Sequence, residues 1–124
     1  MNCPKCRAPM EEVTFQEISV ERCTGCQGLW FGAEEHQRLK KLEGSESIDT
    51  GDPEVGRRQD AVGKIDCPAC KTPMLRMLDP KQPHLWFEAC KICHGVYFDA
   101  GEFKDFKHET LLGFFRDLLP HRRS

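Results

Sequence analysis

The placement of the cysteines constrains this chain more than any other feature of its sequence. All eight belong to C-x-x-C pairs, which are Cys3/Cys6, Cys23/Cys26, Cys67/Cys70 and Cys90/Cys93. Sixteen residues separate the first pair from the second, and nineteen separate the third from the fourth. At such distances two C-x-x-C turns can meet and supply the four thiolates of a tetrahedral zinc site. The pattern therefore predicts two zinc ions per chain.

The composition agrees with a fold that depends on metal. Only 39% of the 124 residues are hydrophobic and 31% are charged, which leaves little apolar surface for a core. The sequence has no run of about 18 apolar residues and no signal-like N-terminus, so we expect a cytoplasmic protein without a membrane span. In a reducing compartment, C-x-x-C pairs indicate metal ligands or redox thiols rather than disulfides.

The sequence contains a tandem repeat. The stretch "CPKCRAPM" returns 64 residues later as "CPACKTPM", and "ERCTGCQGLWFGAEEH" returns 67 residues later as "EACKICHGVYFDAGEF". We therefore divide the chain into a first unit, residues 1–42, and a second unit, residues 65–124. Between them, residues 43–64 carry six acidic and three basic side chains and no apolar periodicity, which predicts a flexible acidic linker. With this division, Cys23→Ser is expected to unfold the first unit and spare the second.

Each unit carries the same order of predicted elements. Alternating apolar and polar residues at 11–23 predict a hairpin, and residues 74–78 and 85–90 take its place in the second unit. Short strands at 29–31 and 96–98 follow the second cysteine pair, and a helix follows each strand. Asp99 with Glu102, and Gly32 with Glu35, have the spacing of helix caps.

Large aromatic residues follow the cysteines in both units. Trp30 and Tyr97 stand at equivalent positions, four residues after Cys26 and Cys93. A large ring at this position is suited to cover the apolar side of a metal site. We interpret both rings as packing residues rather than as a binding platform.

The repeated pattern C-x-x-C-x₃-M … R-C-x-x-C-x-G-L-W-F-x-A-x-E resembles the zinc ribbon family related to the metal-binding domain of transcription factor IIB. Many small bacterial proteins are similar to this family. The resemblance implies that Cys3, Cys6, Cys23 and Cys26 bind one zinc ion, and that Cys67, Cys70, Cys90 and Cys93 bind the other. It also implies a small, metal-stabilised α+β fold of two zinc ribbons. In each ribbon, a β-hairpin with its cysteine knuckles is followed by a short strand and a helix.

The chain departs from the family pattern at the second knuckle of each unit. Gln27 and His94 occupy a position where the family usually has glycine. A glycine at this point of a knuckle often has a positive φ, so we expect either a strained turn or a turn with different hydrogen bonds at both residues. His94, next to Cys93, is also an alternative metal ligand.

The predicted function follows from the ligands and the charge. Four thiolates leave no open position on zinc, and no Ser-His-Asp order, phosphate-binding glycine loop or paired carboxylates occur, so we expect no enzymatic activity. A formal net charge of −2, which zinc-bound thiolates make more negative, disfavours duplex DNA as a partner. We expect a module that binds a protein, in transcription or its regulation as the resemblance implies. A thiol redox or metal-storage protein and an RNA-binding module are the alternatives.

The C-terminal segment of the second unit has no counterpart in the first. Continuing the second helix beyond residue 107 predicts an amphipathic helix that ends at Pro120. Its apolar arc is wider than one small ribbon can cover. We therefore expect Leu112, Phe115 and Leu119 to form a face for a partner protein or a second copy of the chain.

Overall fold

The structure is a computed structural model that describes residues 1–79 and 82–107, with the backbone alone at 82–84. Its elements, in chain order, are β1 (Met10–Phe15), β2 (Ile18–Cys23), β3 (Leu29–Phe31), α1 (Glu35–Lys40), η1 (Ser45–Ile48), α2 (Pro53–Asp60), β4 (Leu75–Asp79), β5 (Gln82–Ala89) and β6 (Val96–Phe98). Residues 102–107 are also helical. The predicted small α+β fold is confirmed.

Each cysteine repeat contains one antiparallel hairpin. In the first, β1 pairs with β2 so that Val13 lies opposite Val20. In the second, β4 pairs with β5, with an irregularity between Leu78 and Asp79. The alternation of apolar and polar residues in β1 and β2 gives this hairpin one face that packs on the core.

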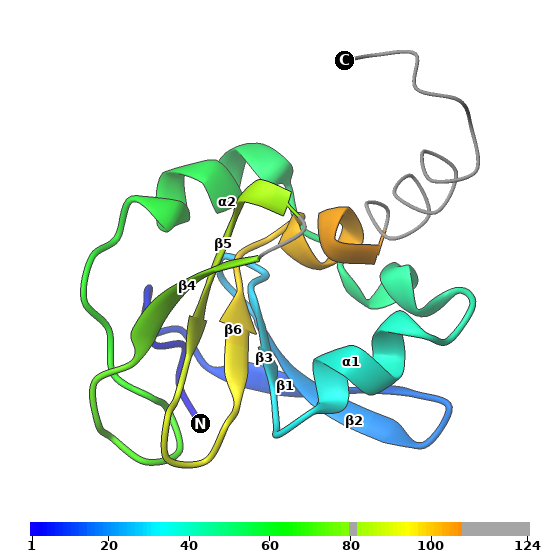
Figure 1. Cartoon of the computed structure of the whole chain (residues 1–124), viewed down its shortest axis with the longest axis horizontal. Helices are drawn as coiled ribbons and strands as arrows, with labels where there is room; N and C mark the ends of the chain where they lie inside the picture. Colours follow the sequence, from blue (N-terminus) through cyan, green and yellow to red (C-terminus); the bar gives the residue numbers. More distant parts are fainter. Residues whose placement is uncertain (80–81, 108–124) are drawn as a thin grey trace.

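The short strands β3 and β6 join the two hairpins into one sheet. They pair with each other in antiparallel orientation, so the six strands have the order β1-β2-β3-β6-β5-β4 (Figure 1). The opposed residues are Leu29 and Phe98, Trp30 and Tyr97, and Phe31 and Val96. These pairs are related by the 67-residue repeat, which places a local two-fold axis between Trp30 and Tyr97. The two units therefore contact each other as the halves of a symmetric dimer would.

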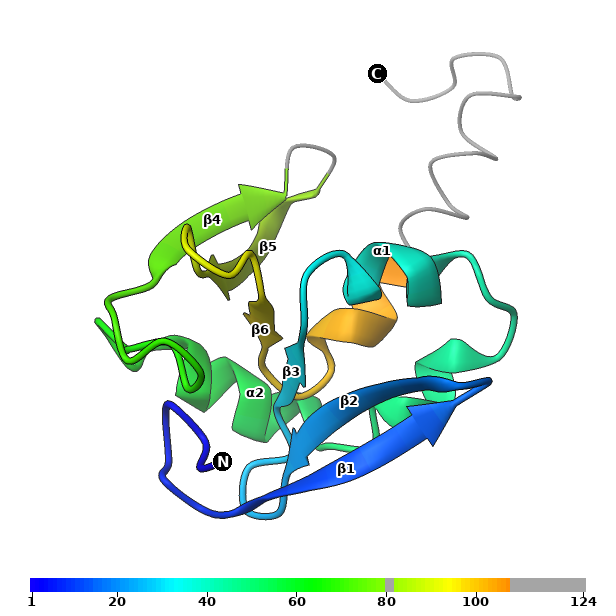
Figure 2. The same ribbon diagram turned by 90° about the horizontal axis from the view of Figure 1, so that it is seen from below.

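One hydrophobic core serves both units. On one face of the sheet α1 and the helical residues 102–107 lie beside each other (Figure 2). Leu39 from α1 and Phe103 from the second helix are fully buried there. Between the helices and the sheet, the Phe31 and Phe98 rings meet edge to face, with centroids 5.6 Å apart. Because the two phenylalanines come from different units, neither unit completes this core alone.

Residues 43–64, expected to be a flexible linker, form ordered structure in contact with both units. Ile48 of η1 is 4% exposed and belongs to the shared core. Helix α2 begins after Asp52, whose side chain accepts a hydrogen bond from the Glu54 amide. Gly56 lies so close to the Ala100 carbonyl that a side chain at this position would overlap it. Low hydrophobicity predicts a linker without regular structure, but a buried apolar residue and capping carboxylates accompany two helical turns in this segment.

Asp49 attaches this segment to the second unit. Its carboxylate accepts hydrogen bonds from the amides of Gly101 (2.9 Å) and Lys104 (3.1 Å), at the start of the second helix. Its side chain is fully buried, and burial raises its pKa, although these two donors oppose the shift. The acidic residue therefore caps a helix that lies 52 residues ahead in the sequence.

The amphipathic helix beyond residue 107, including Leu112, Phe115 and Leu119, lies outside the described residues and stays a prediction. Among the described residues, no helix has the length and apolar character needed to cross a membrane.

The capping role of Asp49 can be tested by stability measurements. Asp49→Ala should lower the free energy of unfolding of the zinc-loaded protein by about 2 kcal/mol, because two amides in a buried environment lose their acceptor. Asp52→Ala, which removes the exposed cap of α2, is the matched control and should cost about 0.5–1 kcal/mol. Urea unfolding followed by circular dichroism measures both. Equal losses in the two variants would contradict the role of Asp49.

Candidate metal centres

All four C-x-x-C turns have the same local structure. In each, the sulfur of the first cysteine accepts hydrogen bonds from the amides two and three residues later, at 3.2–3.4 Å. The residue after the second cysteine adopts a positive φ in every turn: Arg7 (69°), Gln27 (67°), Lys71 (62°) and His94 (65°). The predicted strain at Gln27 and His94 is thus present, since neither residue is a glycine.

The sheet brings these turns together in pairs. The four sulfurs of Cys3, Cys6, Cys23 and Cys26, called the first cluster below, lie within 4.8 Å of one another. The same holds for the second cluster, Cys67, Cys70, Cys90 and Cys93. His94 is exposed and does not belong to the second cluster.

The sulfur positions fit tetrahedral zinc. A Zn–S bond of about 2.3 Å places two ligand sulfurs about 3.8 Å apart. The structure has 3.8 Å between the sulfurs of Cys3 and Cys26, 3.7 Å between those of Cys67 and Cys93, and a shorter 3.3 Å between those of Cys6 and Cys23. Both clusters therefore suit a zinc ion with four thiolate ligands.

In each cluster, the surroundings of one sulfur lower the pKa of its cysteine and so favour the thiolate form that zinc requires. The hydrogen bond with Cys26 lowers the pKa of Cys3 to about 4. Burial raises the pKa of Cys90, but hydrogen bonds from the Cys93 and Ile92 amides outweigh burial and bring it to about 6. Each cluster thus contains a cysteine that is ready to bind metal at neutral pH.

Trp30 and Tyr97 each pack against the metal-binding region of the other unit. Both are buried, at 5% and 0% exposure, as expected for packing residues. Each ring, however, lies against the other unit: the Tyr97 hydroxyl contacts sulfurs of the first cluster, and the Trp30 ring lies against Gly95 of the second knuckle. A Cβ atom at Gly28 would overlap the Tyr97 hydroxyl, and one at Gly95 would overlap the Trp30 ring. The glycines after the knuckles therefore make room for the aromatic residue of the other unit.

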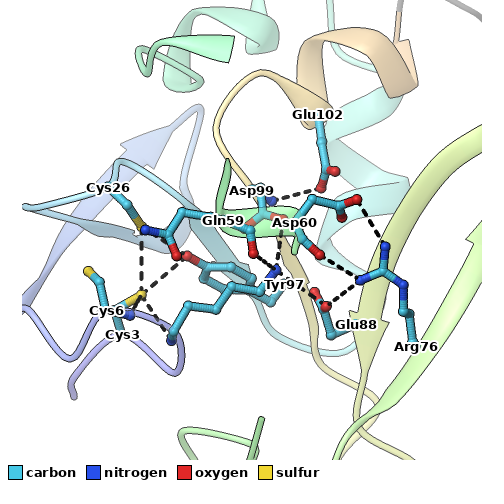
Figure 3. A network of polar contacts seen from close by, with 11 residues as sticks. Cys3, Cys6, Cys26, Gln59, Asp60, Arg76, Glu88, Tyr97, Asp99 and Glu102 are labelled. Carbon is cyan, nitrogen blue, oxygen red and sulfur yellow. Dashed lines mark hydrogen bonds and ion pairs between the residues drawn. The ribbon is translucent and has the colours of Figure 1, made fainter. Parts of the chain in front are cut away.

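A buried ionic network lies beyond the ring of Tyr97 (Figure 3). Lys5, whose side chain is fully buried, forms ion pairs with Asp99 (2.8 Å) and Glu88 (3.3 Å) of the second unit. Its ammonium group also donates to the Gln59 carbonyl at 3.0 Å. A buried lysine is tolerated when such partners offset the cost of taking its charge out of water. Removing one partner alone would leave an uncompensated buried charge.

The sequence pointed to part of this network but not to the ion pairs. The Glu102 carboxylate accepts a hydrogen bond from the Asp99 amide at 2.8 Å, and Glu35 does the same for Gly32, as the capping patterns predicted. The Asp99 side chain forms its ion pair with Lys5. Burial and the neighbouring Asp99 charge raise the pKa of Glu102 to about 9. The carboxylates of Asp60, Asp99 and Glu102 lie within 4.8 Å of one another, and Arg76 neutralises part of this charge through Asp60 (2.9 Å).

Metal content provides the first test of these centres. Protein purified without chelator should contain two zinc ions per chain, and Cys67→Ser with Cys90→Ser should reduce the content to one. Removal of zinc should unfold the protein, because the coordination supplies a large share of the folding energy, and added zinc should restore it. Elemental analysis and circular dichroism provide the measurements. A content of one zinc in the unchanged chain, or iron in place of zinc, would contradict the two-site assignment.

The comparisons with known proteins agree with these centres. Residues 2–42, which include the complete first cluster, match the family model described as a transcription factor zinc-finger, the zinc ribbon of the transcription factor IIB type. No significant match to a curated protein or a solved structure was found. The first unit thus matches a zinc ribbon of the transcription factor IIB type, and the repeated order of elements with a second four-cysteine cluster makes the chain a tandem zinc ribbon protein.

Proposed function

We propose that this chain is a non-enzymatic zinc module that binds a protein partner. In each cluster the four sulfurs fill the coordination positions of tetrahedral zinc, so no position is left for a substrate or a water nucleophile. Zinc in such a site supports the fold. The chemistry available to the protein is then that of its surface.

The observation that carries the proposal is the apolar surface of strand β4. This strand forms one edge of the six-stranded sheet, and one side of its backbone has no neighbouring strand among the described residues. Leu75, Met77 and Leu78 are 48%, 41% and 39% exposed. Native proteins usually protect such edges with charged residues or proline, so an apolar edge indicates a surface that another chain covers.

An extended protein segment fits this edge better than a nucleic acid does. A partner strand would pair with the free backbone of β4, while Leu75 and Met77, which share one face, would bind its apolar side chains. The net charge of −2 disfavours contacts with phosphates. An RNA-binding module would need exposed rings for base stacking, but Trp30 and Tyr97 are buried.

The type of process is suggested by the family alone. The description of the matching family names transcription factors, and we propose a role in transcription or its regulation on that basis. A thiol redox role is less favoured, because five of the eight cysteines are buried and the turns donate hydrogen bonds to their sulfurs. The proposed C-terminal face of Leu112, Phe115 and Leu119 is a second surface that the partner could use.

Variants of β4 test the proposal. Leu75→Asp with Met77→Asp should weaken binding of a captured and purified partner protein by about tenfold or more, because charge replaces the apolar contact surface. Both positions are exposed, so zinc content and circular dichroism should not change. Calorimetry with the purified partner measures the affinity.

Thr14→Asp is the matched control, since it adds a negative charge to an exposed side chain of β1, the other edge strand of the sheet, away from both cysteine clusters. It should leave partner affinity unchanged. Equal affinity of the β4 variant and the unchanged chain would contradict the proposed surface. If Phe115→Asp with Leu119→Asp alone abolishes binding, the partner uses the C-terminal face instead.

A further inference from the structure

The hydroxyl of Tyr97 lies between two sulfurs of the first cluster. It is 3.2 Å from the sulfur of Cys3 and 3.3 Å from that of Cys26, although Tyr97 belongs to the second unit (Figure 3). When both cysteines are thiolates they carry no proton, so the phenol is the donor in these contacts. Strand pairing fixes this position, because Tyr97 lies opposite Trp30 at the centre of the β3–β6 ladder.

The second cluster has no equivalent donor. Its aromatic neighbour from the other unit is Trp30, whose ring lies against Gly95. Within residues 1–79 and 85–107, no side-chain hydroxyl is hydrogen-bonded to a sulfur of Cys67, Cys70, Cys90 or Cys93. The equivalent positions of the repeat thus place the Tyr97 hydroxyl at the first cluster and the carbon edge of the Trp30 ring beside the second.

At the ligand position that the Tyr97 hydroxyl contacts, exposure differs between the clusters in the same direction. Cys26, which contacts the Tyr97 hydroxyl, is only 6% exposed. Its counterpart in the repeat, Cys93, is partly exposed. A chelator or a competing thiol therefore has easier access to the second cluster at this ligand position.

We propose that Tyr97 is a positioning residue for the first zinc ion, and that the second cluster holds the exchangeable zinc of this chain. A hydrogen bond to a zinc-bound thiolate withdraws electron density from the sulfur and stabilises the excess negative charge of a four-thiolate site. The sulfur then accepts a proton or attacks an electrophile less readily. The first zinc ion stays bound while the second can be transferred to another ligand.

Zinc release to a chromophoric chelator tests this difference on the full chain. The unchanged protein should release its two zinc ions in two kinetic phases of equal amplitude. Tyr97→Phe keeps the ring and removes only the hydroxyl, so the slow phase should become about tenfold to a hundredfold faster while the fast phase keeps its rate. A purely structural loss would accelerate both phases together, and that result would overturn the proposal.

Cadmium substitution assigns the phases without relying on release rates. In the ¹¹³Cd NMR spectrum of the loaded protein, Tyr97→Phe should shift the signal of the first cluster and leave that of the second in place. Trp30→Tyr is the reciprocal variant, which puts a hydroxyl at the symmetry-related position, and it should slow the fast phase. Unchanged cadmium signals in Tyr97→Phe would show that the hydroxyl does not act on the metal site, and would overturn the proposal even if both zinc ions are present.

Discussion

The antiparallel pairing of β3 with β6 is the interaction on which the rest of the structure depends. These two three-residue strands place Trp30 opposite Tyr97, and each ring then extends over the metal cluster of the other unit. The same pairing brings Phe31 and Phe98 together on the opposite face, where the shared core forms. A small ribbon has too little apolar surface to be stable without help, and here each ribbon obtains part of its core from its neighbour in addition to its zinc ion.

The two-fold symmetry of this arrangement is broken by a buried ion pair that only one half of the interface has. Lys5 and Asp99 form a buried ion pair across the interface, but the repeat places Ala69 and Gly32 at the two corresponding positions. The lysine and this acidic partner are thus missing together, while Glu21, which corresponds to Glu88, remains at a half-buried position. A carboxylate that keeps contact with water can stay charged without a partner, whereas a fully buried one would cost several kcal/mol. The interface therefore has a buried ion pair at one end and none at the corresponding place. The two clusters differ in the same way, since only the first has a hydroxyl donor.

The local elements could be predicted from the sequence, but the contacts between the units could not. The spacing of the cysteines predicted both clusters, alternation predicted the hairpins, and the knuckle pattern predicted the positive φ of Gln27 and His94. Each of these features depends on residues within one repeat. The contacts of Trp30 and Tyr97 with the other unit, the Lys5 ion pairs and the cap by Asp49 join residues 52 to 94 positions apart, and no local pattern marks them. Residues 43–64 were expected to be flexible because low hydrophobicity does not reveal a buried carboxylate that caps a distant helix.

The central claim is that the two ribbons form one cooperative structure, and hydrogen exchange of zinc-loaded Cys23→Ser tests it most directly. This substitution removes a ligand of the first cluster only. Because β3, Trp30 and Phe31 also support the second unit, amides in β6 and in residues 102–107 should lose protection together with those of β1 and β2, by more than about tenfold. Loss of protection confined to residues 1–42, with β5, β6 and the second helix protected as in the unchanged chain, would contradict the claim and restore the picture of two independent ribbons.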